Sequence, residues 1–272
     1  MAPDLGRRLL AEAIGTALLV VFGAGAVVAA LRLGNGKLDY AGLGIIALSF
    51  ALVIAIVIYA FGTTSGAHIN PAVTVSLTVT RRFPPAEAIP YIAAQLAGAL
   101  VGGLLIIAIF GKGATDLNNT GGTVLGANVT HGQALGAEAL GTFLLVSTIM
   151  ALAVDRRAPA GFAGLVIGLA VACAIMVTGP LTGGSLNPAR TFGPYLTTSI
   201  FGDSPPWKDY WVYVVGPLAG GAVAALLYDF VARPARIEVP TEQGTAGTVE
   251  ARRVAPGEGV EAGTTESSDK RS

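Results

Sequence analysis

The chain has 272 residues, of which 53% are hydrophobic and 12% are charged, and its formal net charge is zero. Its mean hydropathy is +0.65, and its charged fraction lies far below the value of about a quarter that soluble domains carry. These values exclude a soluble globular protein, and the balanced charge gives no indication of a nucleic-acid partner. The single cysteine, Cys173, excludes an internal disulfide.

Six apolar segments are long enough to cross a bilayer, which takes roughly 20 residues per helix. In chain order they predict helices over residues 7–32, 40–61, 87–110, 132–154, 160–178 and 209–232. The first follows two arginines, as a signal peptide would. Its apolar core exceeds the roughly 7–15 residues of such a signal, however, so we keep it as the first helix. The last segment, 233–272, is charged, lacks aromatic residues and predicts a disordered tail.

Three sequence echoes, in the same order, indicate an internal duplication. AEAIGTALLV from Ala11 recurs as AEALGTFLLV from Ala137, and Asn-Pro-Ala at 70–72 recurs at 187–189. QLAGALVGGLL from Gln95 is echoed by PLAGGAVAALL from Pro217. Because each half holds three predicted spans, the second copy enters the membrane from the opposite side, which makes an inverted repeat. The chain therefore divides into a first repeat (1–115), a connecting loop (116–131), a second repeat (132–232) and the tail (233–272).

Basic residues are unevenly divided between the two sides of this topology. Arginines at 7–8, 81–82, 156–157, 233 and 236 all fall on one side, whereas the other side carries fewer basic residues interspersed with aspartates. This excess predicts that the arginine-rich side, with both termini, faces the cytoplasm.

The stretch SGAHINPAV at 65–73 lies in a charge-free run, 40–80, that is about two spans long. A second crossing would put the arginines at 81–82 on the wrong side, so the segment is expected to dip into the membrane and return. Residues 62–66, rich in Gly and Thr, are predicted to descend without helical structure. Asn70 is then an N-cap with Pro71 at the first helical position, and a half-helix runs to about residue 80.

The same pattern recurs over residues 178–196. An irregular descent is predicted through Gly179, Pro180, Gly183 and Gly184, followed by Asn187 as N-cap and Pro188 as the start of a second half-helix. Non-helical backbone at membrane depth must be buried in protein or line a wet cavity, so the two half-helices are expected to meet N-terminus to N-terminus. Each asparagine oxygen then caps its own half-helix, and each NH₂ group points into the cavity as a donor. The two positive helix ends oppose cations there.

With these motifs the sequence resembles the aquaporin, or major intrinsic protein, family. The resemblance lies in SGAHINPAVT, in GGSLNPARTFGP and in the duplicated helix starts, and it covers about residues 5–232. It implies an all-α membrane protein with six transmembrane helices plus two half-helices in an inverted repeat. It also implies a homotetramer in membrane lipid with one pore per subunit. SLNPARTFGPYL and WVYVVGPLAG are most similar to archaeal and bacterial water channels, which implies a prokaryotic plasma membrane. The pore residues implied by the two motifs are Asn70, Pro71, Ala72, Asn187, Pro188 and Ala189.

The resemblance further implies a four-residue selectivity filter. Transferred by spacing from the two asparagines, its positions are Phe50, Ile175, Gly184 and Arg190. A separate argument supports a functional role for Arg190. A charge at membrane depth costs roughly 2.5–3.5 kcal/mol on insertion scales and is functional by default. Strict water channels of the family carry His at the position of Ile175. Glycerol channels carry Gly there, an aromatic residue at the position of Gly184 and Asp at that of Thr191. This chain matches neither pattern. The presence of Thr191 in place of that Asp favours a water channel.

Four more residues are assigned to the pore lining and to support of the loops. Glu12 and Glu138 occupy equivalent places in the two repeats, where a glutamate is either a proton relay or an acceptor that holds a descending loop in shape. The resemblance favours the acceptor. His68 is expected to be a neutral pore-lining donor, with a titrating gate as the alternative. Gly183 is assigned to the second loop.

The favoured function is a passive channel that conducts water in single file and excludes protons and ions, with small neutral solutes as further substrates. A facilitator of glycerol or similar solutes is the alternative. A coupled secondary transporter is the third hypothesis, since such proteins also use inverted repeats and broken helices. It would need a titratable group at the substrate site, for which only Glu12, Glu138 and His68 qualify. Neither a metal cluster nor a nucleophile–base set is evident at membrane depth, so we expect no enzyme, no metal and no cofactor.

Overall fold

The computed structural model describes residues 4–232, and the predicted disordered tail at 233–272 lies outside them. The described chain is helical, with six helices long and apolar enough to cross a membrane. The first span consists of α1 (Leu5–Leu19), a π-helical turn (Val20–Ala24) and α2 (Gly25–Leu33). The other spans are formed by α3 (Tyr40–Ser65), α5 (Pro85–Phe110), α7 (His131–Ile149) with a π-helical turn (Met150–Val154), α8 (Ala163–Thr182) and α10 (Val212–Ala232), the last preceded by a 3₁₀ turn (Trp207–Asp209).

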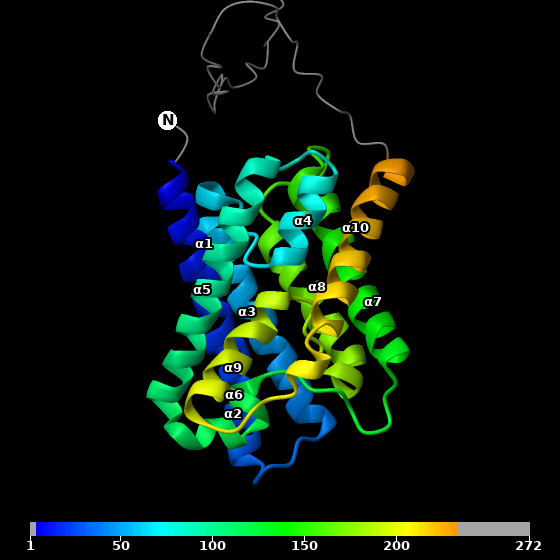
Figure 1. Ribbon diagram of the computed structural model, residues 1–272. Coiled ribbons are helices and arrows are strands. Elements are labelled where there is room, and N and C mark those ends of the chain that lie inside the picture. The colour runs from blue at the N-terminus through cyan, green and yellow to red at the C-terminus, as the bar shows by residue number, and fades with distance from the viewer. Residues whose placement is uncertain (1–3, 233–272) are drawn as a thin grey trace, which may run out of the picture. The chain divides into compact units, whose positions relative to one another are not determined.

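Two shorter helices lie inside the bundle formed by these spans. They are α4 (Pro71–Val79) and α9 (Pro188–Phe201), with 9 and 14 residues. At about 1.5 Å per residue, neither reaches across a hydrocarbon core of about 30 Å. Figure 1 shows α4 in the half of the bundle where α1 begins and α9 in the other half. The connection between α5 and α7 contains a 3₁₀ turn (Lys112–Asp116) and the short segment α6 (Asn118–Gly121).

The predicted descents at 62–66 and 179–184 are partly wrong. Helix α3 continues to Ser65, and α8 continues through Pro180 to Thr182. Each helix ends at a glycine in the left-handed conformation, Gly66 with φ 87° and Gly183 with φ 81°. Clusters of Gly, Thr and Pro are tolerated inside membrane helices because neighbouring groups satisfy the freed backbone. A residue that must turn left-handed ends the helix, and glycine does so without a Cβ penalty.

Matching close contacts join the first and third spans of each repeat. A Cβ on Gly98 of α5 would lie 2.1 Å from the carbonyl oxygen of Ala13 on α1. A Cβ on Gly220 of α10 would lie 2.0 Å from that of Ala139 on α7. Only glycine permits such an approach of two helix backbones, and small residues at these positions are typical of membrane helix packing.

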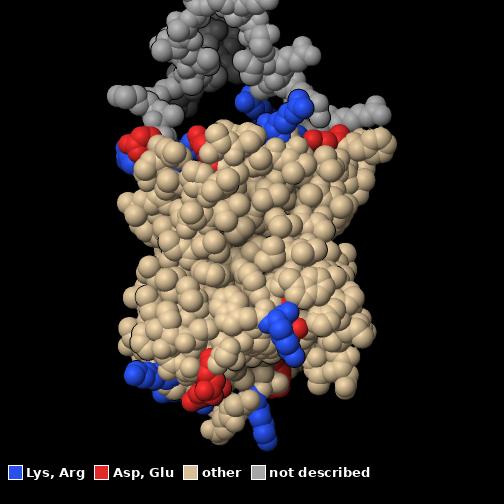
Figure 2. Space-filling view, viewed as in Figure 1, with Lys and Arg blue, Asp and Glu red and all other residues tan. Residues whose placement is uncertain are grey.

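The surface of the bundle is divided between charged ends and an apolar belt. Figure 2 shows charged side chains gathered at the two ends of the visible face and an almost uncharged belt between them. Large apolar side chains that point outward include Ile45, Ile56, Ile89, Ile109, Leu140, Val177 and Phe230. With the six apolar helices, this surface indicates a multi-pass membrane protein.

We call the end at which α1 begins and α10 ends the arginine end. Three ion pairs lie there: Arg8–Glu87 at 2.7 Å, Arg82–Asp229 at 2.5 Å and Arg157–Asp155 at 2.5 Å. The first two join distant segments of the chain, whereas the third lies within the loop that follows Val154.

Candidate functional site

The two half-helices begin in the same way. Asn70 and Asn187 have extended backbone, with φ of −157° and −153°. The Oδ1 atom of Asn70 accepts the N–H of Ala72 at 2.8 Å, and that of Asn187 accepts the N–H of Ala189 at 3.0 Å. Pro71 and Pro188 follow at the first helical position, where the missing N–H costs nothing. The asparagine N-caps that the sequence predicts are therefore present.

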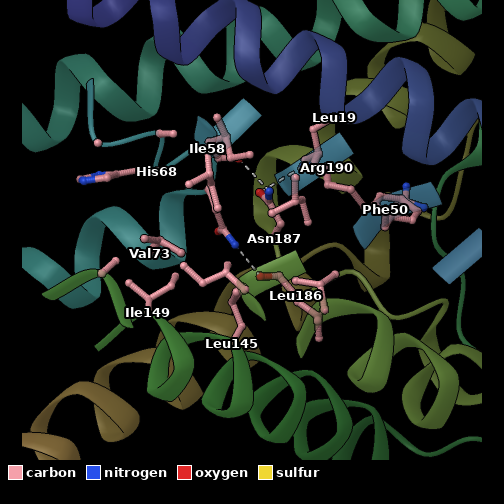
Figure 3. A pocket seen from close by; sticks show the side chains of 18 of the residues that line it. Leu19, Phe50, Ile58, His68, Val73, Leu145, Ile149, Leu186, Asn187 and Arg190 are labelled. Carbon is pink, nitrogen blue, oxygen red and sulfur yellow. Dashed lines mark hydrogen bonds between the residues drawn. The ribbon is translucent and has the colours of Figure 1, made fainter. Parts of the chain in front are cut away.

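Each asparagine also reaches across to the opposite half-helix. Asn70 Nδ2 donates to the carbonyl of Leu186 at 2.8 Å, and Asn187 Nδ2 donates to that of Ile69 at 2.9 Å (Figure 3). Ile69 and Leu186 have left-handed backbone, with φ of 44° and 56°, a rare conformation for branched side chains. The crossed bonds use one hydrogen of each amide, so one hydrogen of each remains as a donor. The expectation that the whole NH₂ group faces the cavity is corrected accordingly.

The first loop, residues 66–70, joins α3 to α4. Glu12 lies behind this loop and is fully buried. Its Oε1 atom accepts from Ser65 Oγ at 2.7 Å and from the N–H of His68 at 2.9 Å. Its Oε2 atom accepts from the N–H of Ile69 at 2.7 Å and from Gln95 Nε2 at 2.8 Å. All four partners donate, so the carboxylate acts as the acceptor in each bond.

The second loop, residues 183–187, joins α8 to α9. Glu138 lies behind this loop in the same manner. Its Oε1 atom accepts from Thr182 Oγ1 at 2.7 Å and from the N–H of Ser185 at 2.9 Å, and its Oε2 atom accepts from the N–H of Leu186 at 2.7 Å. It too is fully buried. Neither glutamate lines the cavity described next.

A cavity of about 200 Å³ follows the line where the two half-helices meet. Its walls are mainly apolar and include Leu19, Ile54, Ile58, Val73, Leu77, Leu145, Ile149, Ile167 and Val171. Its polar lining consists of His68, Asn70, Ser185, Asn187 and Arg190. In Figure 3, His68 lies at one side of the cavity and Phe50 with Arg190 at the other. Such a cavity offers few hydrogen-bond partners besides those at the half-helix starts.

Arg190 is 1% exposed and ends beside Phe50. Its Nη1 donates to the carbonyl of Gly121 at 2.9 Å, and its Cζ lies 4.9 Å from the centroid of the Phe50 ring. This is the distance of a cation–π contact. Its Nε has no protein partner, and Arg190 takes part in none of the ion pairs found within residues 4–232. The guanidinium therefore keeps donor capacity at the cavity.

The other two predicted filter residues lie beside the second loop. Ile175 is 2% exposed, and a Cβ on Gly184 would lie 3.2 Å from its Cα and Cγ1 atoms. Gly184 N donates to Thr182 Oγ1 at 3.1 Å. Of the four predicted filter positions, the structure brings Phe50 and Arg190 to the cavity, whereas Ile175 and Gly184 are not among its lining residues.

His68 lines the side of the cavity that lies toward the arginine end. Its Nδ1 lies 3.1 Å from Thr74 Oγ1, and its ring packs against Phe83 and Tyr91 with centroid distances of 4.8 and 5.3 Å. Tyr91 in turn accepts from Arg8 Nε at 2.9 Å. The imidazole is thus held in an aromatic cluster that borders the cavity.

Several polar residues at the site are absent from the sequence prediction. Gln95 donates to Glu12 and, at 3.0 Å, to Thr74 Oγ1. Tyr91 and Tyr213 donate to the carbonyls of Ser65 and Thr182. The sequence does contain signals for these residues. Gln95 is a polar residue in an apolar span, and Tyr91 and Tyr213 are separated by the same spacing as the QLAG and PLAG segments. No comparable signal marks Gly121, whose contribution is a backbone carbonyl. Within residues 4–232, no group of three His, Cys, Asp or Glu side chains is arranged to hold a metal.

A model of the major intrinsic protein family matches residues 2–228 of the chain. The chain belongs to the major intrinsic protein family. Among its relatives is a probable aquaporin, AqpM, from Archaeoglobus fulgidus. The two sequences are 48% identical over a region that covers 86% of this chain and 100% of the relative. Aquaporin AqpM from Methanothermobacter marburgensis is 45% identical over 84% of this chain and 98% of its own length. The solved aquaglyceroporin from Plasmodium falciparum has the same fold, with a TM-score of 0.75, 26% identity and coverage of 85% of this chain and 98% of that chain.

Proposed function

We propose that this chain is a passive channel that conducts water in single file through the cavity and excludes protons and ions. The observation that carries the proposal is the pair of crossed asparagines where two half-helix N-termini meet inside an apolar-walled cavity. The two archaeal relatives are named as aquaporins, which supports the same function. Members of the family are channels, and we propose no enzymatic activity.

Exclusion of protons follows from the direction of the donors. The free amide hydrogens of Asn70 and Asn187 donate to the oxygen of a passing water, so its own hydrogens point away toward both ends. A chain of like-oriented hydrogen bonds is interrupted at that molecule. The apolar walls offer no alternative partner. The two half-helix N-termini add positive potential, which opposes cations, and such barriers are a general device of water-selective pores.

Arg190 supplies a second barrier. Its fixed charge repels cations, and its free donor capacity binds the oxygen of a passing neutral molecule. Phe50 lines the cavity beside the guanidinium. We assign Ile175 and Gly184 to the same filter, because Ile175 of α8 lies against Gly184, which belongs to the loop that leads into α9 and Arg190.

Glu12 and Glu138 are proposed to hold the loops in shape rather than to carry protons. Each accepts from two loop N–H groups and is closed off from the cavity. A coupled transporter needs a titratable carboxylate that meets its substrate. Within residues 4–232, no carboxylate lines the cavity, which argues against coupling.

The assembly and orientation are proposed as for the family. Large apolar side chains face outward on the spans, as helices in contact with lipid or with further subunits require. We propose a homotetramer in a prokaryotic plasma membrane, with the arginine end and both termini in the cytoplasm.

Osmotic swelling and shrinkage of proteoliposomes test the function. We expect water flux well above that of empty liposomes and no added proton leak. A flux equal to that of empty liposomes would refute the channel. Transport that stops when the proton gradient is removed would instead support a coupled secondary transporter.

Glycerol is the second candidate substrate, because Ile175 and Gly184 bring no polar side chain to the filter. Replacing Ile175 by His adds a polar ring, so Ile175→His is expected to lower glycerol flux relative to water flux. Val177→His is the matched control on the same helix, since Val177 is 68% exposed and faces away from the bundle. Equal glycerol-to-water ratios in wild type and Ile175→His would show that Ile175 does not belong to the filter.

A further inference from the structure

The ring of Phe50 packs against a backbone position that has no side chain. A Cβ placed on Gly23 would lie 2.2 Å from Cε1 of Phe50 and 2.6 Å from both Cδ1 and Cζ. Carbon atoms in contact lie about 3.5–4.0 Å apart, so any side chain at Gly23 requires the ring or the backbone to move by more than about 1 Å. Phe50 lines the cavity and Gly23 does not. A ring displaced from Gly23 therefore moves toward the cavity.

Gly23 lies in the π-helical turn Val20–Ala24 of the first span. A π turn inserts one extra residue into a helix, and such turns occur frequently at functional sites. The N–H of Gly25 donates to the carbonyl of Val20, five residues earlier, as the π geometry requires. The turn thus sets which backbone atoms of the first span face α3.

A hydrogen bond fixes α3 to this turn beside the glycine contact. Ser49 Oγ donates to the carbonyl of Phe22 at 2.7 Å. Ser49 precedes Phe50, and Phe22 precedes Gly23, so two successive residues of α3 meet two successive residues of the turn. The backbone of Phe50 is therefore held at a set distance from Gly23, and little freedom remains except in the ring.

We propose that Gly23 is a specificity-determining positioning residue of the channel. By lacking a side chain, it lets the Phe50 ring lie back from the cavity and so sets the width of the passage that Phe50 and Arg190 line together. This inference rests on the proposed function of Phe50 and Arg190 as a conducting constriction. It predicts that residue 23, which does not touch the permeating molecule, controls the flux and the size limit.

The test compares Gly23→Ala with Gly25→Ala in proteoliposomes, by stopped-flow light scattering in sucrose and glycerol gradients. Gly25 directly follows the same π turn, but a Cβ there would meet its nearest atom, Ile106 Cγ1, at an ordinary 3.7 Å. Because the displaced ring narrows the passage, we expect Gly23→Ala to reduce water flux at least about fivefold and glycerol flux by more. Gly25→Ala is expected to stay within about twofold of wild type, since it adds no clash.

A double variant separates positioning from damage to the fold. Gly23→Ala combined with Phe50→Leu removes the clash, so its water flux should return to that of Phe50→Leu alone. A π turn that is merely disrupted by alanine would not be restored by a change at residue 50. Wild-type-like fluxes of Gly23→Ala, or a loss that Phe50→Leu does not restore, would overturn the inference. A wild-type protein that conducts no water would instead overturn the proposed function, and the inference with it.

Discussion

Residues 66–70 and 183–187 occupy equivalent places in the two repeats, 117 positions apart, and both are held by a buried glutamate. Ser65 and Thr182, at the same spacing, each donate to that glutamate at 2.7 Å. A tyrosine then donates to the carbonyl of each, Tyr91 at 3.0 Å and Tyr213 at 2.9 Å. The parts that shape the loops have therefore been kept in both copies.

The side chains that face the cavity differ between the copies. Val73 stands where the second half-helix has Arg190, and both line the cavity. His68 stands where the second loop has Ser185. The loop-holding bonds are local to each repeat, whereas the charged side chain of Arg190 lines the cavity in the second repeat only. The comparison teaches that duplication supplied a symmetric scaffold, and we propose that selectivity arises from the unlike residues at its equivalent positions.

The supports of the two loops also differ in origin. Thr74 is hydrogen-bonded by Gln95 from α5 of its own repeat. Its counterpart Thr191 lies 2.8 Å from the hydroxyl of Thr123, which belongs to the connecting segment. That segment also supplies the Gly121 carbonyl to Arg190. The second half-helix is therefore tied to a buried part of the connecting segment, and the first to a spanning helix.

The largest effect is expected from removal of either loop-holding carboxylate. Glu12→Ala leaves four donors without an acceptor and Glu138→Ala leaves three, at roughly 1–3 kcal/mol for each buried donor. Both variants should lose many degrees in the midpoint of thermal unfolding in detergent, and Glu12→Ala should lose more. Glu87→Ala is the control, because its partly exposed ion pair with Arg8 is worth only about 0–1 kcal/mol. A wild-type midpoint in either loop variant would contradict the comparison.

A smaller effect, on selectivity rather than folding, is expected when the second half-helix is given the residue of the first. Arg190→Val removes the fixed charge and its donors, so cations and glycerol should pass faster. A loss of about 1.4 kcal/mol from the barrier corresponds to about a tenfold rise in rate. Ion leak and glycerol flux in proteoliposomes measure this. Arg190→Lys keeps the charge, so it should retain cation exclusion; an Arg190→Val channel as selective as wild type would remove Arg190 from the filter.

The smallest effect, a pH-dependent change in thermal stability, is expected at Asp155, which follows α7 and its π turn. Residues 29–33, in the corresponding part of the first repeat, contain no acid. Hydrogen bonds from the Arg157 side chain, its backbone N–H and Tyr228 hold the pKa of the Asp155 carboxyl well below its usual range. A carboxyl with a depressed folded-state pKa stabilises the fold above its unfolded pKa of about 3.9, and this contribution fades as the pH falls toward the folded value.

Thermal unfolding of wild type and Asp155→Asn between pH 7 and pH 3 measures this contribution. The wild type should be the more stable at neutral pH, and the difference should shrink below about pH 4. Arg157→Gln removes the partner and should flatten the profile in the same way. A difference that is constant with pH would show that the ion pair does not stabilise this end of the second repeat.

Much of the architecture was determined by the sequence alone, because its causes are local. Six spans follow from runs of apolar residues, since a helix in lipid must satisfy its own backbone. The half-helix starts follow from Asn70-Pro71 and Asn187-Pro188, because an N-cap depends on its next three residues. The duplicated AE-G-T and Asn-Pro-Ala motifs were sufficient to indicate the inverted arrangement.

The tertiary structure alone decided which distant groups meet. Helices α3 and α8 pass through segments that look like breakers and end only where Gly66 and Gly183 turn left-handed. The crossed asparagine bonds, the Gly121 carbonyl on Arg190 and the contact of Gly23 with Phe50 join residues 27 to 118 positions apart. Such contacts depend on how the spans pack, and packing is set by the fit of whole helix surfaces rather than by neighbours in the chain.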